Sequence, residues 1–289
     1  MRNQRIAVVT DSTACLSLEI IKMYQPTLTV VPLTVFLDGK TYLDGTLTQE
    51  EFFQKLRVSR SAKTSAPITQ SFIETYETAI KLGRKSIISV HVSTWASPGT
   101  ETSAKVAIEE VRRNNSHVNI SFWNSQFVSM ALGWQAIVAA NLADQGADVD
   151  HILEALSDLR ARTRLIVVLD TLEYLRRGGR IGKAQTLLGS ILSIKPILTL
   201  DQGEILPLAR ERTLPKAFKK MVEIADSWGP LEQVAVSSGD TLKREEELVK
   251  LLTEREIFSG EIQRVSISSV IGVHGGPGLV GILAVKKRN

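Results

Sequence analysis

One histidine, His274, lies in a stretch rich in glycine and proline that could bring its ring to a ligand. Residues 268–278 read Ser-Ser-Val-Ile-Gly-Val-His-Gly-Gly-Pro-Gly, between two apolar runs that predict strands. This composition predicts a tight turn with little side-chain bulk to obstruct a ligand. The imidazole can donate a hydrogen bond from either ring nitrogen, depending on its tautomer. The alternative is an ordinary turn whose histidine caps a strand.

Short polar side chains are concentrated where predicted strands end, at 11–13, 93–100 and 124–125. In α/β sheets, ligands bind in the crevice outside the carboxyl ends of the strands, so these side chains predict a polar site. Thr64 and Ser65 add two hydroxyls in a polar segment, 59–67, that we expect to be a linker. The alternatives are that Thr64 and Ser65 begin a helix, and that Ser97 and Thr100 cap one.

Composition excludes several classes of protein. The chain has 289 residues, 43% of them hydrophobic and 23% charged, which is typical of a soluble globular protein. Its net charge of +4 and its aromatic content of 6% argue against a nucleic-acid partner. The single cysteine, Cys15, suits a reducing compartment. The first apolar run, 6–9, is too short for a signal peptide, and no run approaches a membrane span. We therefore expect a cytoplasmic protein with no transmembrane segment.

The sequence matches familiar catalytic and cofactor motifs only in part. Residues 276–281 match the dinucleotide pattern G-x-G-x-x-G, but a strand-like run follows where a helix is needed. Residues 178–184 resemble a phosphate-binding loop, but they are one residue short and lack its Ser/Thr. The four histidines share no metal-ligand spacing, and Cys15 has no candidate base nearby in sequence. We therefore expect no cofactor and no metal.

Hydrophobic periodicity predicts an α/β fold. In the first half, strands are predicted at 6–10, 29–37, 86–92 and 118–122. They alternate with helices at 16–24, 48–57, 69–82 and 126–143, and with one that follows residues 93–100 and ends near 113. This alternation predicts a mostly parallel sheet with helices on both faces. The second half begins with a helix at 149–162, a strand at 165–169 and a short helix at 171–177. A hairpin at 195–210 and two helix–strand alternations follow. A boundary near 146–149 predicts two domains, 1–147 and 148–289.

Several stretches together resemble the DegV family, the bacterial fatty-acid-binding proteins. The likeness covers nearly the whole chain, and its order and spacing are specific although each piece alone is weak. The stretches are residues 9–14, 31–33, 64–67, 93–100, 172–181, 194–198 and 274–278. The resemblance implies a two-domain α/β fold, with a mixed sheet in the C-terminal domain and one long-chain fatty acid in the cleft between the domains. It also implies a non-catalytic carrier that presents the carboxylate to a separate fatty-acid kinase, which makes an acyl phosphate.

The resemblance assigns roles to particular residues. The expected ligand-binding residues are Thr64, Ser65, Ser93, Thr94, Ser97 and His274. Arg176 and Arg212 are expected to contact the kinase, although exposed charges are more often simply solvated. Hydroxyls and one imidazole would hold the carboxylate without a buried arginine. The alternative function is an enzyme acting on a small carboxylate or phosphorylated substrate. His274 would then be its general acid or base, and Gly178–Arg180 would lie near an anion.

Three residues depart from the family pattern. Ala66 replaces the usual glutamine, Pro98 interrupts a Ser-Gly-Thr motif, and Asn124 replaces an aspartate. We expect these departures to affect the geometry of the site more than the fold.

Overall fold

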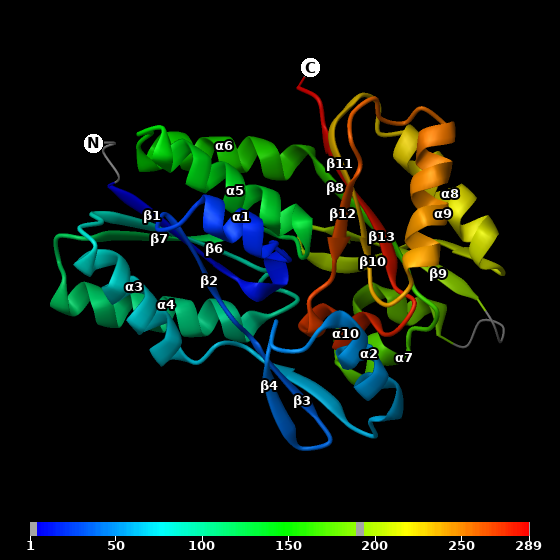
Figure 1. The fold of residues 1–289 in the computed structure, drawn as a ribbon, viewed down its shortest axis with the longest axis horizontal. Helices are drawn as coiled ribbons and strands as arrows, with labels where there is room; N and C mark the ends of the chain where they lie inside the picture. The colour runs from blue at the N-terminus through cyan, green and yellow to red at the C-terminus, as the bar shows by residue number, and fades with distance from the viewer. Residues whose placement is uncertain (1–4, 189–193, 289) are drawn as a thin grey trace.

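The computed structural model describes residues 5–188 and 194–288, which form two large β-sheets with flanking helices and a third, smaller sheet (Figure 1). The first sheet is parallel, in the order β2-β1-β6-β7. All six residues of β1 are buried, as expected for a strand covered on both faces. The strands are β1 (Ile6–Asp11), β2 (Leu28–Val31), β6 (Ser86–His91) and β7 (Asn119–Asn124).

Helices cover both faces of this sheet, as predicted. On one face, Phe72 and Tyr76 of α3 pack with residues of α4 against the sheet. On the other face, α5 and α6 contribute alanines, Ile152 and Leu156 (Figure 1). The helices are α1 (Leu18–Met23), α3 (Thr69–Lys81), α4 (Pro98–Asn114), α5 (Met130–Asp144) and α6 (Val149–Arg162). A 3₁₀ turn, η1 (Ser12–Ala14), follows β1.

The second sheet has six strands in the order β10-β9-β8-β13-β11-β12 and is mixed, as expected. Its neighbouring strands are antiparallel except for β11 and β12, which are parallel. The predicted hairpin is confirmed: Gln202 and Gly203 between β9 and β10 have φ of 47° and 88°, as a type I′ turn requires. The strands are β8 (Thr163–Val168), β9 (Lys195–Asp201), β10 (Glu204–Glu211), β11 (Leu231–Ser238), β12 (Gln263–Ser266) and β13 (Val280–Lys286).

Two helices of the second half cover one face of the mixed sheet, and two shorter helices follow β8. Phe218 and Met221 of α8 (Leu214–Asp226) and Leu248 of α9 (Leu242–Glu254) fill the core on the covered face. The chain leaves β8 into α7 (Glu173–Arg177) and a 3₁₀ helix, η2 (Gly182–Leu187). The opposite face of the sheet is therefore free to meet the first half of the chain.

The sequence prediction is wrong for residues 29–37 and 59–67. The first run is not one strand: β2 ends at Val31, and β3 (Thr34–Leu37) begins a separate sheet in the order β4-β3-β5. Proline cannot donate to a strand ladder, and Pro32 lies at this break. The second segment is not merely a linker, because it contains β5 (Ala62–Ser65), which pairs with β3. The sheet is completed by β4 (Lys40–Leu43), and α2 (Gln49–Val58) follows it.

The stretch around His274 forms a helix, not the tight turn that its composition predicts. Helix α10 (Ser269–Gly275) begins where the Ser268 hydroxyl accepts a hydrogen bond from the Ile271 N–H at 3.3 Å. Val270 and Val273, three residues apart, bury one face of the helix in a hydrophobic cluster. Only at Gly276, with φ of 75°, does glycine end the helix.

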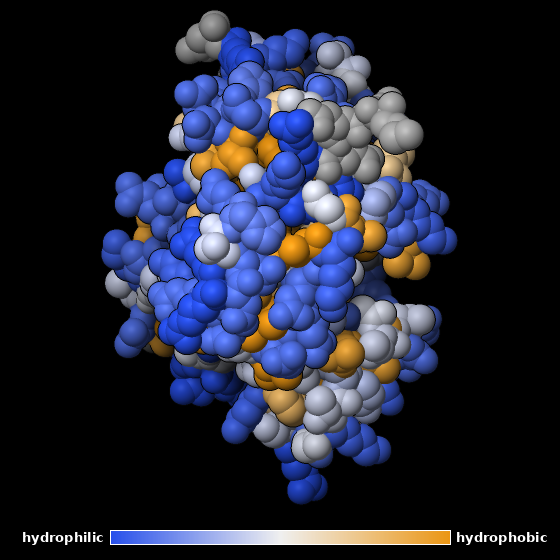
Figure 2. Space-filling view, turned by 90° about the vertical axis from the view of Figure 1, so that its left-hand side faces the viewer, coloured by the Kyte–Doolittle hydropathy of each residue, from blue (hydrophilic) through white to orange (hydrophobic). Residues whose placement is uncertain are grey.

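Residues from both halves of the chain form one hydrophobic core cluster. Val35 of β3 and Phe52 of α2 pack in one cluster with Leu172 and Val270 from the second half. The predicted boundary near 147 falls in the turn between α5 and α6, and the division into 1–147 and 148–289 stays a prediction. On the face in Figure 2, the atoms that are not grey are mostly hydrophilic, with small separate apolar patches.

Candidate functional site

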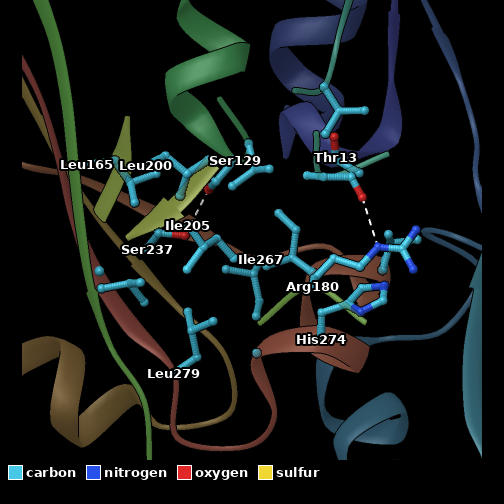
Figure 3. A pocket seen from close by; sticks show the side chains of 18 of the residues that line it. Thr13, Ser129, Leu165, Arg180, Leu200, Ile205, Ser237, Ile267, His274 and Leu279 are labelled. Carbon is cyan, nitrogen blue, oxygen red and sulfur yellow. Dashed lines mark hydrogen bonds between the residues drawn. The ribbon is translucent and has the colours of Figure 1, made fainter. Parts of the chain in front are cut away.

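A cavity of about 130 Å³ lies against the face of the mixed sheet that α8 and α9 leave free. Alternate residues of a strand lie on the same face, so the sheet lines the cavity with residues two positions apart. From the central strands these are Leu165, Val167, Leu198, Leu200, Gly281 and Leu283. Ile205 of β10, Ile267 and Leu279 extend this aliphatic lining (Figure 3). The cavity wall is therefore largely apolar.

Three of the predicted site residues meet at this cavity. Thr64 on β5 and His274 on α10, 210 residues apart, are joined by a 2.9 Å hydrogen bond between Thr64 Oγ1 and His274 Nε2. Ser97 lines the same cavity, and its Oγ lies 2.9 Å from Thr100 Oγ1. Ser97 is the N-cap residue of α4 but makes no side-chain capping bond, so capping does not account for its hydroxyl. These three side chains form the polar cluster.

His274 is neutral near pH 7. Burial and the positive charge of Arg180 lower the pKa of its imidazole to about 4. Its Nδ1 is buried and has no hydrogen-bond partner among the described residues. Gly178, at the end of α7, packs against the ring, where any side chain would collide with it. A neutral imidazole with one unpaired nitrogen can still bond a ligand oxygen.

Arg180 is a site residue that the sequence prediction of the carboxylate site left out. It lines the cavity beside His274 (Figure 3), and its guanidinium donates to the carbonyls of Ala96 at 3.0 Å and Gly178 at 2.7 Å. Arg180 is half-buried, whereas the sequence prediction had hydroxyls and one imidazole hold the carboxylate without a buried arginine. The one available signal was its position just after the Gly-Gly pair that ends α7.

The other three predicted ligand-binding residues lie outside the cavity lining. Ser65 is exposed, because it alternates with Thr64 along β5. Ser93 is buried, and its hydroxyl donates to the carbonyl of Gly203 in the β9–β10 turn at 2.8 Å. Thr94 uses its backbone N–H to bond Asn124 Oδ1 at 3.3 Å. Ser93 and Thr94 thus shape the loop that carries Ser97 rather than lining the cavity.

The departures from the family pattern have local explanations. Pro98 occupies the first turn of α4, where the missing N–H would have no hydrogen-bond acceptor within the helix. Asn124 Oδ1 accepts bonds from the N–H groups of Thr94 and Gln126, and an aspartate could accept both as well. Ala66 faces Gly99.

The two predicted partner-binding arginines are exposed. Arg176 on α7 is bonded to Glu173, at 2.8 Å, and so is its neighbour Arg177, at 2.7 Å. These pairs hold the pKa of Glu173 at about 2, so the carboxylate offsets part of the local positive charge. Arg212 follows β10 on the surface.

A buried Asp–His–Ser arrangement lies behind the cavity. Asp11 Oδ2 is 3.0 Å from His91 Nδ1, and His91 Nε2 is 2.6 Å from the Ser89 hydroxyl. All three side chains are fully buried and outside the cavity lining, so a substrate could not reach this serine. Asp11 Oδ1 instead accepts a bond from the Thr13 hydroxyl, and Thr13 does line the cavity. The arrangement positions Thr13.

Within residues 5–188 and 194–288, no group of three or more His, Cys, Asp and Glu side chains is placed to hold a metal ion. No helix in those ranges is long and apolar enough to cross a membrane.

Comparisons with known proteins agree with this fold. The family model described as "Uncharacterised protein, DegV family" matches residues 5–287. A DegV domain-containing protein from Streptomyces coelicolor is 36% identical over 284 residues, which are 97% of this chain and 98% of the relative.

Solved structures are similar over the whole chain. A DegV family protein from Thermus thermophilus, described by its fatty-acid binding, is 30% identical. Its TM-score is 0.89, with 98% of this chain and 100% of that chain covered. DegV from Bacillus subtilis, described as a fatty acid binding protein, is also 30% identical, with a TM-score of 0.83 and coverages of 98% and 99%. From the family match and these relatives, this chain belongs to the DegV family.

Proposed function

We propose that this chain binds a long-chain fatty acid. The carboxylate would bond Thr64, Ser97 and His274 near Arg180, and the alkyl tail would lie along the aliphatic wall. The observation that carries the proposal is one cavity with a polar cluster on one side and a largely aliphatic lining. DegV relatives with a similar fold are described as fatty-acid-binding proteins.

The tail would supply most of the affinity. Burial of about 0.8 kcal/mol per methylene gives a sixteen-carbon chain on the order of 10 kcal/mol before ordering costs. A hydrogen bond to a charged group adds about 1.5–3 kcal/mol. The polar cluster would therefore mainly fix which end of the ligand faces α10.

We infer that the chain is a carrier with no catalytic role of its own. A general base works best when its pKa is near the operating pH, and the pKa of His274 is about 4. The imidazole is better suited to holding a carboxylate by a hydrogen bond than to removing a proton. Action of His274 as general base on a small substrate is therefore the weaker hypothesis.

We propose that a separate kinase receives the carboxylate and makes the acyl phosphate. The sequence has no credible nucleotide-binding loop, so the nucleotide would be held by that partner. Exposed Arg212, with Arg176 on the other approach, would speed a transient encounter with an acidic surface. We place this step in the cytoplasm, in line with the single cysteine, which is free.

Denaturing extraction of the purified protein followed by mass spectrometry tests the binding proposal. We expect about one long-chain fatty acid per chain from a bacterial host. Thr64→Ala, Ser97→Ala and His274→Ala should retain less lipid while keeping a cooperative thermal unfolding transition. A lipid-free preparation that also fails to take up palmitate or oleate would refute the proposal.

A further inference from the structure

A second polar group lines the cavity away from the His274 cluster. The hydroxyls of Ser129 and Ser237 lie 3.0 Å apart, and the two residues are only 4% and 3% exposed. Figure 3 shows them facing each other on one side, with His274 and Arg180 on the other and aliphatic side chains between. A ligand whose carboxylate is at His274 would therefore bring part of its tail to these serines.

Ser129 keeps its hydroxyl there despite a strained backbone. Its φ of 55° and ψ of −153° fall in a region that glycine adopts easily and other residues avoid. Ser129 precedes α5, yet its side chain makes no capping bond. The strained conformation is held by its N–H, which donates to the Thr13 carbonyl at 2.8 Å. Helix capping therefore does not explain this serine.

The sheet leaves room for a ligand beside Ser237. In the strand register, Ser237 is opposite Gly281, followed by Val167 and Leu198, and all four residues line the cavity. A Cβ on Gly281 would lie 3.1 Å from the Ile166 carbonyl, so this position favours glycine. Neighbouring strands are about 4.8 Å apart, so a tail lying over Gly281 passes within reach of the Ser237 hydroxyl.

The serine pair has hydrogen-bonding capacity left over. Two hydroxyls offer two donors and four lone pairs, and their mutual bond uses one of each. The Ser129 hydroxyl also lies close enough to bond the Cys15 sulfur, which opposes the effect of burial on that thiol. Unused lone pairs therefore remain at the cavity wall. A plain methylene chain cannot bond them, whereas a hydroxyl on the chain can donate to them.

We propose that the Ser129–Ser237 pair is a subsite for a hydroxyl group part-way along the acyl chain, so that the preferred ligands include hydroxylated long-chain fatty acids. This inference rests on the proposed fatty-acid binding and names a ligand class for the same cavity. Ser237 would select for a hydroxyl on the acyl chain, and Ser129 would hold the Ser237 hydroxyl in place.

The test is a set of dissociation constants for stearate and for 2-, 9-, 10- and 12-hydroxystearate. They are measured by displacement of a fluorescent fatty acid from delipidated parent, Ser237→Ala, Ser129→Gly and Ser266→Ala. Ser129→Gly removes the hydroxyl and suits the positive φ, so it folds even if Ser237→Ala does not. Ser266→Ala is the matched control, because Ser266 is an exposed serine on the adjacent β12, outside the cavity lining.

For at least one mid-chain isomer, we expect the affinity relative to stearate to fall about tenfold in both Ser237→Ala and Ser129→Gly. In Ser266→Ala, the ratio of the affinity for each hydroxystearate to that for stearate should stay at the parent value. For 2-hydroxystearate, this ratio should stay at the parent value in every variant. Ratios that are equal in all four proteins, with stearate still bound, would overturn the subsite alone. Failure of the parent to bind stearate and all hydroxystearates would overturn the fatty-acid proposal itself.

Discussion

Replacing Gly178 with alanine should displace His274 without straining the backbone. Gly178 has φ of −77°, which alanine adopts freely. A Cβ there would lie 2.8 Å from His274 Cε1, still closer to Nδ1, and 3.2 Å from the Tyr174 carbonyl. Ordinary carbon contacts begin near 3.5 Å, so the imidazole has to move by about 1 Å.

That movement should break the polar cluster. The bond between Thr64 Oγ1 and His274 Nε2 is 2.9 Å long, and a shift of about 1 Å takes it beyond hydrogen-bonding range. A carboxylate that depends on the same ring loses about 1.5–3 kcal/mol. The dissociation constant for stearate should then rise about 10- to 150-fold, while aliphatic burial keeps the ligand bound.

Displacement of a fluorescent fatty acid measures this change, and Gly179→Ala is the matched control. Gly179 is the next residue, with φ of 68°, and no atom of the described residues lies within 4 Å of an added Cβ. Alanine there strains the backbone by about 1–2 kcal/mol but does not touch the imidazole. Thermal unfolding checks that both variants are folded. If Gly178→Ala binds stearate as tightly as Gly179→Ala does, the orientation of His274 does not govern binding.

Three further predictions concern pH, thiol reactivity and the partner. The pKa of His274 is about 4 in the folded protein and about 6.5 when unfolded, so the free energy of unfolding should fall by about 3 kcal/mol between pH 7 and pH 4. Denaturant titrations should show a weaker fall in His274→Gln, and equal falls would contradict the assignment. Burial raises the pKa of the Cys15 thiol to about 12, so alkylation by iodoacetamide at pH 8 should be about a thousandfold slower than in urea; similar rates would contradict it. Arg212→Ala should slow kinase-coupled phosphorylation and reduce its salt dependence while stearate affinity stays at the parent value; unchanged turnover would make Arg212 a bystander.

Sequence patterns predicted the elements whose signals are local. The helix predicted at 48–57 is confirmed as α2, which begins with a capping box: the Thr48 N–H donates to Glu51 Oε2 at 2.9 Å and the Glu51 N–H donates to Thr48 Oγ1 at 3.2 Å. The β9–β10 hairpin and the buried β1 were found for the same reason. Each was encoded by residues a few positions apart.

Features that depend on distant contacts were missed. Strand β5 alternates exposed and half-buried residues, so it has no apolar signal, and only pairing with β3 makes it a strand. Helix α10 has a density of glycine that predicts a turn, yet packing of its two valines in the shared core stabilises it. Arg180 reaches the cavity because its guanidinium bonds the Ala96 carbonyl, 84 residues away. None of these contacts has a short-range pattern.

The geometry separates the groups that would orient the ligand from those that would retain it. Two backbone carbonyls fix the Arg180 guanidinium, and burial together with the charge of Arg180 lowers the pKa of His274 and keeps the imidazole neutral. A carboxylate would then meet a nearby positive charge and hydrogen-bonding groups, while aliphatic burial supplies most of the free energy of binding. Loss of one polar bond should weaken binding without abolishing it. In the carrier role proposed above, the ligand's carboxylate would be exposed to a partner while the tail stays buried, because the contacts broken at the polar end are the minor part of the affinity.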